Sequence, residues 1–103
     1  MTKRTLYAPL IHSNGTSKKE LQEAIANAAR EIRKASEALR ETLPHGRDYY
    51  PLRDNLAYNK ARAQYIAQST ALQNIYDELV AIFNAIENGE TTCQVETTIE
   101  VGG

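Results

Sequence analysis

The sequence has little cysteine, no tryptophan and no long apolar run. Cys93 is the single cysteine, so the chain contains neither a disulfide framework nor a cysteine metal cluster, and we expect a reducing compartment. The N-terminal segment lacks an apolar stretch long enough for a signal peptide, and no segment approaches the length that spans a bilayer. These absences predict a cytoplasmic protein that does not interact with membranes.

An excess of charge of either sign is also missing, since the net charge is −1. The electrostatic field of the whole molecule therefore favours neither DNA nor an anionic membrane surface. A nucleic-acid role would need a local basic patch, and no such patch dominates the sequence. We expect no DNA partner.

Catalytic and metal-binding patterns are equally sparse. His12 and His45 do not accompany a serine or cysteine in a recognisable nucleophile arrangement, and there is no glycine-rich phosphate loop. His45 and Asp48 supply two possible metal ligands, which is too few for a site. We therefore expect no enzyme, no bound metal and no cofactor.

The composition itself is that of a folded protein. Hydrophobic residues make up 42% of the 103 residues and charged residues 24%, which is typical of one globular domain spanning 1–103. The core of a chain this small is modest, and oligomerisation often completes it. We expect a homo-oligomer.

The hydrophobic periodicity predicts a mainly α fold, an antiparallel two-helix hairpin flanked by short N- and C-terminal β-strands (β-α-α-β). The predicted segments are a strand or extended arm over 4–12, a helix over 17–43, a loop over 44–51, a helix over 52–88 and a strand over 91–101. Pro9 cannot donate to a strand ladder, so the first strand is an edge strand or an arm.

Local signals set the limits of the first helix. Ser17 followed by Glu20 is a capping box, in which the hydroxyl and the carboxylate each accept a free backbone amide. Pro44 and Gly46 are expected to end the helix. Its apolar residues step by four and three and form a seam for the partner helix: Leu21, Ile25, Ala28, Ile32, Ala35 and Leu39. The charged residues of the opposite face, Arg30 and Arg33 among them, are assigned to solvent.

The second helix is predicted to begin around Pro51 to Asp54 and to stop at Asn88 and Gly89. Its second half is more apolar than the narrow seam of the first helix can cover. Either the terminal strands or another subunit must cover the remainder. Tyr58 and Tyr65 lie on one face of this helix, either in the core of the hairpin or on a surface for a nucleotide.

The C-terminal strand is predicted from strict alternation, with Cys93, Val95 and Thr97 facing inward and glutamate or polar residues between them. The N-terminal strand, from the same chain or from a neighbouring one, is the expected partner. Lys3 and Arg4 would then suit Glu96 and Glu100 on the opposite strand.

The loop between the helices carries more functional chemistry than a connection needs. The Arg47 guanidinium suits phosphate or carboxylate, and Arg53 lies near the amide-rich start of the second helix. Tyr49 or Tyr50 offers a ring on which a base could stack. The alternative is structural: Asp48 pairs with one of the arginines, and one tyrosine packs beneath the loop.

The turn before the first helix is the second polar segment, and it contains Asn14, Thr16, Ser17 and Lys18. Capping and turn chemistry account for it. The turn and the loop lie at opposite ends of a helix of roughly 40 Å. They form one site only if two subunits meet antiparallel.

Two motifs, "IHSNGTSKKEL" and "HGRDYYP", resemble those of small uncharacterised phage and prophage proteins. Such proteins carry an asparagine-glycine-threonine-serine helix start and an (N/H)-G-R-D-Y-Y loop, here with His45 at the first position of the loop motif. The resemblance covers about residues 10–88 and implies an origin in phage, without implying an activity.

We therefore expect a non-enzymatic phage-type protein that acts against host defence in the host cytoplasm. The favoured mechanism is sequestration of a nucleotide-like anionic signal between subunits, with Arg47 and Arg53 holding phosphate and the residues from Asn14 to Lys18 completing the site. The alternative is a protein–protein inhibitor or adaptor that contacts a host defence protein, or a structural helper of a phage or mobile element, with no small ligand.

Overall fold

A computed structural model describes residues 2–50 and 55–98 of the chain. The elements in order are β1 (Thr2–Tyr7), α1 (Lys18–Leu39), the 3-10 helix η1 (Arg40–Thr42), α2 (Gly46–Tyr49), α3 (Asn55–Asn88) and β2 (Thr92–Thr97). The molecule is mainly helical, with one antiparallel two-stranded sheet built from the two ends of the chain. The predicted order of strand, helix, helix and strand is confirmed.

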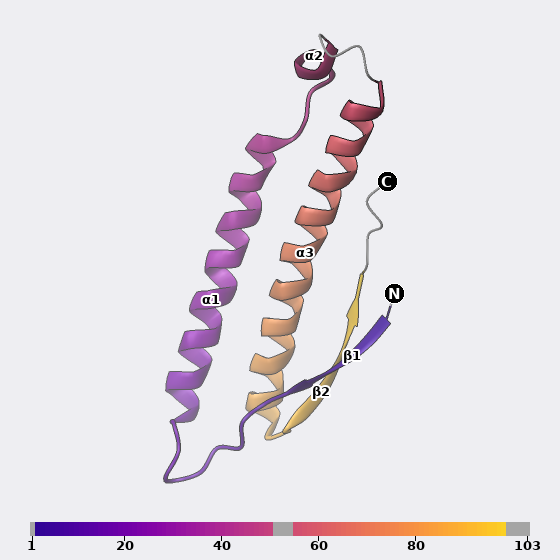
Figure 1. The fold of residues 1–103 in the computed structure, drawn as a ribbon. Helices are drawn as coiled ribbons and strands as arrows, with labels where there is room; N and C mark the ends of the chain where they lie inside the picture. The colour runs from indigo at the N-terminus through magenta and orange to yellow at the C-terminus, as the bar shows by residue number, and fades with distance from the viewer. Residues whose placement is uncertain (1, 51–54, 99–103) are drawn as a thin grey trace.

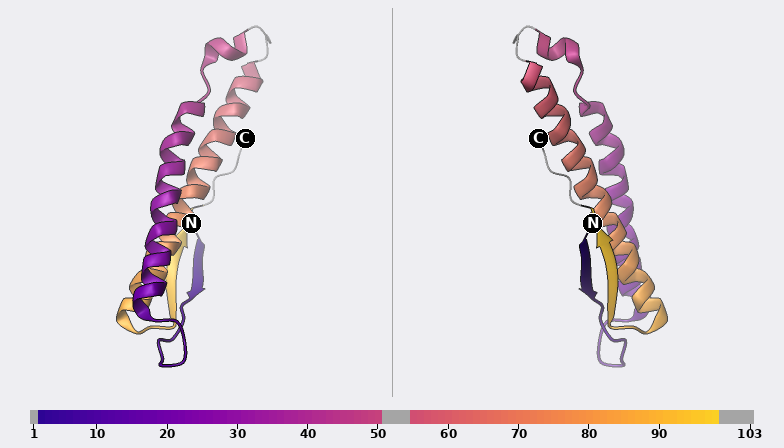
Figure 2. Two further views of the ribbon diagram at one scale, coloured as in Figure 1. Left: turned by 90° about the vertical axis from the view of Figure 1, so that its left-hand side faces the viewer. Right: turned by 90° about the vertical axis from the view of Figure 1, so that its right-hand side faces the viewer.

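The two long helices lie side by side and antiparallel, and the sheet lies along the C-terminal half of α3 (Figure 1). The sheet is mainly on the side of α3 that faces away from α1, and it is confined to one half of the length of the hairpin (Figures 1 and 2). The loop that contains α2 is at the other end. Each end of the molecule therefore presents a different set of residues.

The strands pair within one chain. Lys3 faces Glu96 and Arg4 faces Val95 in the ladder. Arg4 forms its ion pair with Glu78 on α3, at 2.7 Å between Nη1 and Oε2, and so ties the sheet to the helix. The predicted pairing of Lys3 with Glu96 agrees with this register, whereas Glu100 lies outside the described residues.

The first strand is shorter than predicted. β1 ends at Tyr7, and the amide of Ala8 donates one further hydrogen bond to the Thr91 carbonyl at 2.9 Å. Pro9 has no amide hydrogen, so the ladder stops there. Of the predicted strand or extended arm over 4–12, residues 8–12 therefore lie outside the strand. Leu10 and Ile11 follow in an exposed connection.

The second strand shows the predicted alternation. Cys93, Val95 and Thr97 are half-buried, and the residues between them are exposed. Of the predicted range 91–101, the strand occupies Thr92–Thr97, and residues 99–101 lie outside the described part of the chain.

The core lies where both helices and both strands meet. Ala8, Ala85 and Ile86 are buried there, and the half-buried side chains that pack on them are Leu21, Ile25, Ile82 and Cys93. The strands therefore cover much of the apolar surface of α3 that α1 leaves open. Of the two alternatives for covering the apolar half of this helix, the terminal strands therefore provide at least a part of the cover.

The seam of α1 differs from the predicted one by one residue at two positions. Ala29 is buried and Ser36 is half-buried, whereas Ala28 and Ala35 are exposed. Both seams run from Leu21 to Leu39 in five steps, so their average period is the same, and the contact face is instead rotated about the helix axis toward Ala29 and Ser36. The residues that face α3 are Ala29, four positions after Ile25, and Ser36, four positions after Ile32.

The limits of α1 also differ from the predicted helix of 17–43. Ser17 is the cap, α1 ends at Leu39, and the chain tightens into η1 before Pro44. Gly46 does not end this helix, because it is the first residue of α2, a single helical turn inside the predicted loop of 44–51. A negative backbone angle and open space around Gly46 mean that a side chain would fit there.

The end of α3 is set by Gly89, which has a φ of +71°. The Gly89 amide donates to the Ile86 carbonyl at 3.2 Å and the Glu90 amide to the Ala85 carbonyl at 2.8 Å. This pair of bonds is a Schellman motif, which needs a left-handed residue after the helix. The predicted stop at Asn88 and Gly89 is confirmed, whereas the predicted start at 51–54 lies outside the described residues.

The molecule is elongated and thinly packed. Its principal extents are 63 × 25 × 16 Å, and its radius of gyration is 18.3 Å, against about 13 Å for a compact domain of this length. The buried hydrophobic residues in the described segments are Leu6, Ala8, Ala29, Ala85 and Ile86, so alanine dominates the core. Among the helices of these segments, none combines the length and the apolarity that crossing a bilayer requires.

The accessible surface is correspondingly large, at 7577 Å². A compact monomer of this size exposes about 5,800 Å², so the excess is roughly 1,800 Å². That excess is comparable with the total area buried at a standard protein–protein interface.

Candidate functional site

The loop between the long helices presents its charged side chains to solvent. His45 is extended and precedes the single turn of α2, in which the Asp48 amide donates to the His45 carbonyl at 3.0 Å. The side chains of His45, Arg47 and Asp48 are exposed. Within the described residues, none of these three side chains forms a hydrogen bond or an ion pair.

The two adjacent tyrosines have different environments. Tyr49 is half-buried, and its ring centroid lies 6.0 Å from that of Tyr58 on α3, with the planes tilted by 53°. Tyr50 is 82% exposed. Tyr49 therefore holds the loop against α3, which is the structural role considered for one tyrosine, and Tyr50 is left available for a ligand.

The structural alternative, in which Asp48 pairs with one of the two arginines, is tested for Arg47 alone. Asp48 makes no ion pair with Arg47. Arg53 lies outside the described residues, so its place relative to Arg47 stays a prediction.

Some residues of the turn before α1 make contacts that stabilise the fold, and others make no side-chain contact of this kind within the described residues. The Ser17 hydroxyl caps the helix by accepting the Glu20 amide at 3.1 Å, although Glu20 does not return a bond to the Ser17 amide. Lys18 forms an ion pair with Glu87 of α3 at 3.1 Å. Asn14 and Thr16 are exposed, and no side-chain hydrogen bond engages them in the described segments.

The shape of this turn depends on a contact between His12 and Gly15. The Gly15 amide donates to the His12 carbonyl at 3.1 Å. A Cβ at position 15 would lie 2.8 Å from the His12 ring nitrogen Nε2, closer than side-chain atoms pack. Glycine therefore lets the histidine ring lie over the turn.

The loop and the turn are far apart within one chain. α1 has 22 residues, which corresponds to about 33 Å of helix, and the two segments lie at its opposite ends (Figure 1). The predicted separation is confirmed. The nine predicted site residues that the structure describes therefore form two groups, and a single chain does not bring the groups together.

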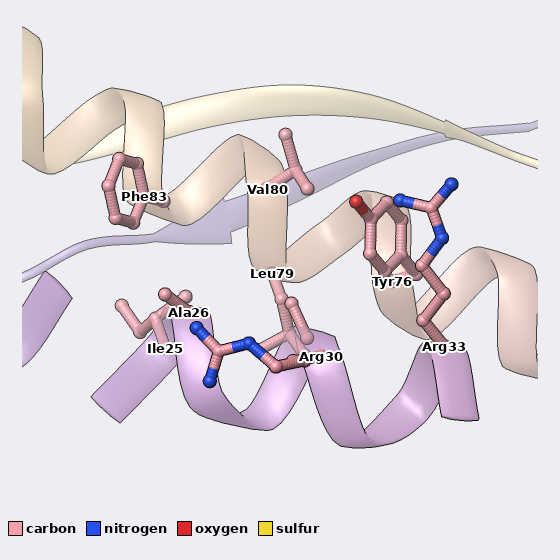
Figure 3. A pocket seen from close by; sticks show the side chains of 9 residues that line it. Ile25, Ala26, Arg30, Arg33, Tyr76, Leu79, Val80 and Phe83 are labelled. Atoms are coloured by element: carbon pink, nitrogen blue, oxygen red, sulfur yellow. The ribbon is translucent and has the colours of Figure 1, made fainter. Parts of the chain in front are cut away.

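The structure also contains a groove between α1 and α3. Its lining residues are Ile25, Ala26, Ala29, Arg30, Arg33, Tyr76, Leu79, Val80 and Phe83, and its volume is about 300 Å³. Arg33 lies beside the Tyr76 ring near one end of the groove, with Phe83 toward the other end (Figure 3). We call this set the interhelix groove.

Sequence reasoning missed the interhelix groove because it placed Arg30 and Arg33 on the solvated face of α1. The arginines recur at helical spacing with Ala26, and this is the only signal in the sequence. A row of charges at that spacing fits a solvent-exposed face equally well. Packing against α3 is what places Tyr76 and Phe83 beside them.

The electrostatics of the groove are unbalanced. The Arg33 guanidinium lies 5.8 Å from the centre of the Tyr76 ring. Arg30 donates to the Asn27 side-chain oxygen at 2.6 Å, which carries no charge. Neither arginine forms an ion pair with the residues that the structure describes.

Polar side chains of α1 and α3 contact each other near the turn that precedes α1. Gln22 donates to the Glu87 carboxylate at 2.9 Å and Lys18 lies 3.1 Å from the same oxygen, so α1 and α3 are linked there. The hydrogen bond from Gln22 lowers the pKa of Glu87, and the hydrogen bond and positive charge of Lys18 lower it further.

Other chemistry is sparse in residues 2–50 and 55–98. No group of three or more histidine, cysteine, aspartate or glutamate side chains there is placed to hold a metal ion. Cys93 is a free thiol packed at the edge of the core.

No protein-family model matches the chain, and no curated protein or solved structure is significantly similar to it.

Proposed function

We propose that this chain is a non-enzymatic, phage-type binding protein that assembles into a homo-oligomer and captures a nucleotide-like anion between subunits. In this proposal it acts against host defence, in the cytoplasm of the host cell, by removing a nucleotide signal. The observation that carries the proposal is the state of the loop, where Arg47 and Tyr50, three positions apart in sequence, are both exposed without partners among the described residues.

The chemistry of this pair fits a phosphorylated ring. A guanidinium binds phosphate through two parallel hydrogen bonds, and an exposed tyrosine ring stacks on a base. Tyr49 supports the pair indirectly, because its contact with Tyr58 fixes the loop on α3. A loop that needed only to join two helices would not need either exposed side chain.

Assembly supplies the second half of the site. The excess surface of roughly 1,800 Å² and the alanine-rich core favour burial against further copies. Antiparallel neighbours would bring the loop of one subunit to the turn of the next. Asn14 and Thr16 are the turn residues with side chains free to bind there, since Ser17 and Lys18 are engaged within the chain.

The assignment to phage rests on the resemblance of the turn and loop motifs. The anti-defence role follows from that origin by analogy. The binding chemistry does not depend on it and is tested separately.

Calorimetry with a panel of cyclic and linear nucleotides tests the binding. We expect at least one member to bind, and Arg47→Gln together with Tyr50→Ala to abolish the heat while the mass of the assembly stays unchanged. Lys34→Gln is the matched control, because it removes a positive charge that is paired with Glu31 on the outer face of α1. Absence of heat for every nucleotide would remove this function.

One observation favours a second candidate, a protein–protein inhibitor or adaptor. Ile66, Ile75 and Val80 on α3 are 41%, 44% and 38% exposed, and a protein partner could bury some of this apolar surface. If they contact a host protein, Ile66→Ser and Ile75→Ser would weaken that contact, whereas the loop substitutions would not.

A further inference from the structure

We propose that the interhelix groove is a second binding site, formed within a single chain, for a small molecule that combines a planar ring with an anionic group. This site differs from the junction between subunits in its residues and in its independence of assembly. It does not rest on the function proposed above.

The floor of the groove accepts a ring. Leu79, Val80 and Phe83 of α3 supply apolar surface, and the small side chains of Ala26 and Ala29 on α1 leave the space in which a ring can lie. Its volume of about 300 Å³ is at the lower limit of small-molecule sites. Tyr76 and Phe83 supply aromatic surface that suits offset contact with a planar group.

The rim of the groove favours a ligand with a negative charge. Arg30 and Arg33 lie at its edge without ion pairs among the described residues, and Arg33 is already oriented by the Tyr76 ring at 5.8 Å. An apolar helix packed over the groove would leave two buried, unpaired guanidinium groups, which is strongly unfavourable. A ligand with its own anionic group satisfies them, so we assign the groove to such a molecule.

The groove continues into a polar extension that can hold the anionic part. Arg33 and Tyr76 line both compartments, and the extension adds Ser36, Arg40 and Gln73, with a volume of about 330 Å³. Glu37 also lines it and limits how much negative charge fits. One phosphate group between Arg33 and Arg40, with its ring on the apolar floor, matches the two compartments.

Amide chemical-shift mapping of the full chain tests this site. The probes are adenosine 5′-monophosphate, adenosine as the ring without the anion, and inorganic phosphate as the anion without the ring. We expect the monophosphate to shift the amides around Arg33, Tyr76 and Val80, and to bind at least about tenfold more tightly than either part.

Two variants and one control make the test specific. Arg33→Gln is expected to weaken binding of the monophosphate about tenfold. If Arg33→Gln disturbs the fold, Arg30→Gln provides a second test and is also expected to weaken binding, because the only hydrogen bond of the Arg30 side chain among the described residues is to Asn27. Lys34→Gln leaves the affinity unchanged, because Lys34 does not line the groove and pairs with Glu31.

Three results would overturn the assignment. No shift at millimolar monophosphate removes the site. Shifts confined to the loop and the turn before α1 remove it while leaving the subunit-junction function intact. A fall in the mass of the assembly on Arg33→Gln would mean that a second copy of the chain occupies the groove.

Discussion

Asn74 on α3 makes two hydrogen bonds with one backbone unit, that of Thr98. Its side-chain nitrogen donates to the Thr98 carbonyl at 2.6 Å, and its side-chain oxygen accepts the Thr98 amide at 3.2 Å. The amide side chain thus continues the pairing of the chain just beyond β2 and fixes the sheet along the helix. The Arg4–Glu78 ion pair provides the corresponding link for β1.

Replacing Asn74 is therefore expected to loosen the sheet. Asn74→Ala leaves a half-buried carbonyl and amide without partners and should lower the free energy of unfolding by about 1–3 kcal/mol. Urea denaturation measures the change. Gln73→Ala is the control, since Gln73 is exposed and bonds only to Asp77, and its effect should stay within about 0.5 kcal/mol. Equal effects of the two substitutions would mean that the paired bonds contribute nothing.

The two glycines at opposite ends of the hairpin should respond in opposite ways to alanine. Gly89→Ala forces a side chain into the left-handed region at φ +71° and should cost about 1–2 kcal/mol. Gly46→Ala meets open space within a helical turn and should be neutral or stabilising by up to about 1 kcal/mol. Thermal unfolding of both variants measures the contrast, and a neutral Gly89→Ala would contradict the Schellman assignment.

The adjacent tyrosines should separate stability from binding. Tyr49→Ala removes the ring contact with Tyr58 and should destabilise the chain by about 1–2 kcal/mol. Tyr50→Ala removes a side chain that is 82% exposed, so stability should change by less than about 0.5 kcal/mol. The second variant should nevertheless lose nucleotide binding. Thermal melts and calorimetry on the same samples distinguish the two roles, and a large stability loss for Tyr50→Ala would show that both rings are structural.

Acid should weaken the link between α1 and α3. The hydrogen bond from Gln22 lowers the pKa of Glu87 in the folded state, and the hydrogen bond and positive charge of Lys18 lower it further. The carboxylate therefore contributes its full stabilisation at pH values above the ordinary glutamate pKa of about 4.3. That contribution disappears as the pH falls through the lowered folded-state pKa. Denaturation midpoints between neutral and acidic pH measure it.

Glu87→Gln should be less stable than the parent protein at neutral pH and should show a shallower decline in acid. Glu41→Gln is the matched control, because Glu41 is an exposed glutamate in η1 with no side-chain partner among the described residues. Parallel pH profiles for the parent and Glu87→Gln would contradict the role of this cluster.

Most of the fold could be predicted from the hydrophobic periodicity of the sequence. The alternation around Cys93 and Val95 predicts β2, and the apolar steps predict both helices, because each pattern has one geometric solution. The contact face of α1 is less determined. Ala28 and Ala29 are both small and apolar, so only the packed helix shows which of them turns inward.

The candidate sites could be predicted to different degrees. The loop stood out because Arg47 and Tyr50 exceed what a helix connection requires. The interhelix groove could not be found in this way, because Tyr76 and Phe83 follow Arg30 and Arg33 by more than forty positions in the sequence. Such juxtapositions arise from tertiary packing, which local periodicity does not encode.

Native mass spectrometry tests the central claim, capture of a nucleotide-like anion between subunits, most directly. At micromolar protein with the nucleotide panel present, we expect an oligomer that retains nucleotide, and an Arg47→Gln oligomer of the same subunit number that retains none. A monomer in the parent protein, or an oligomer that holds no nucleotide under any of these conditions, would contradict the claim.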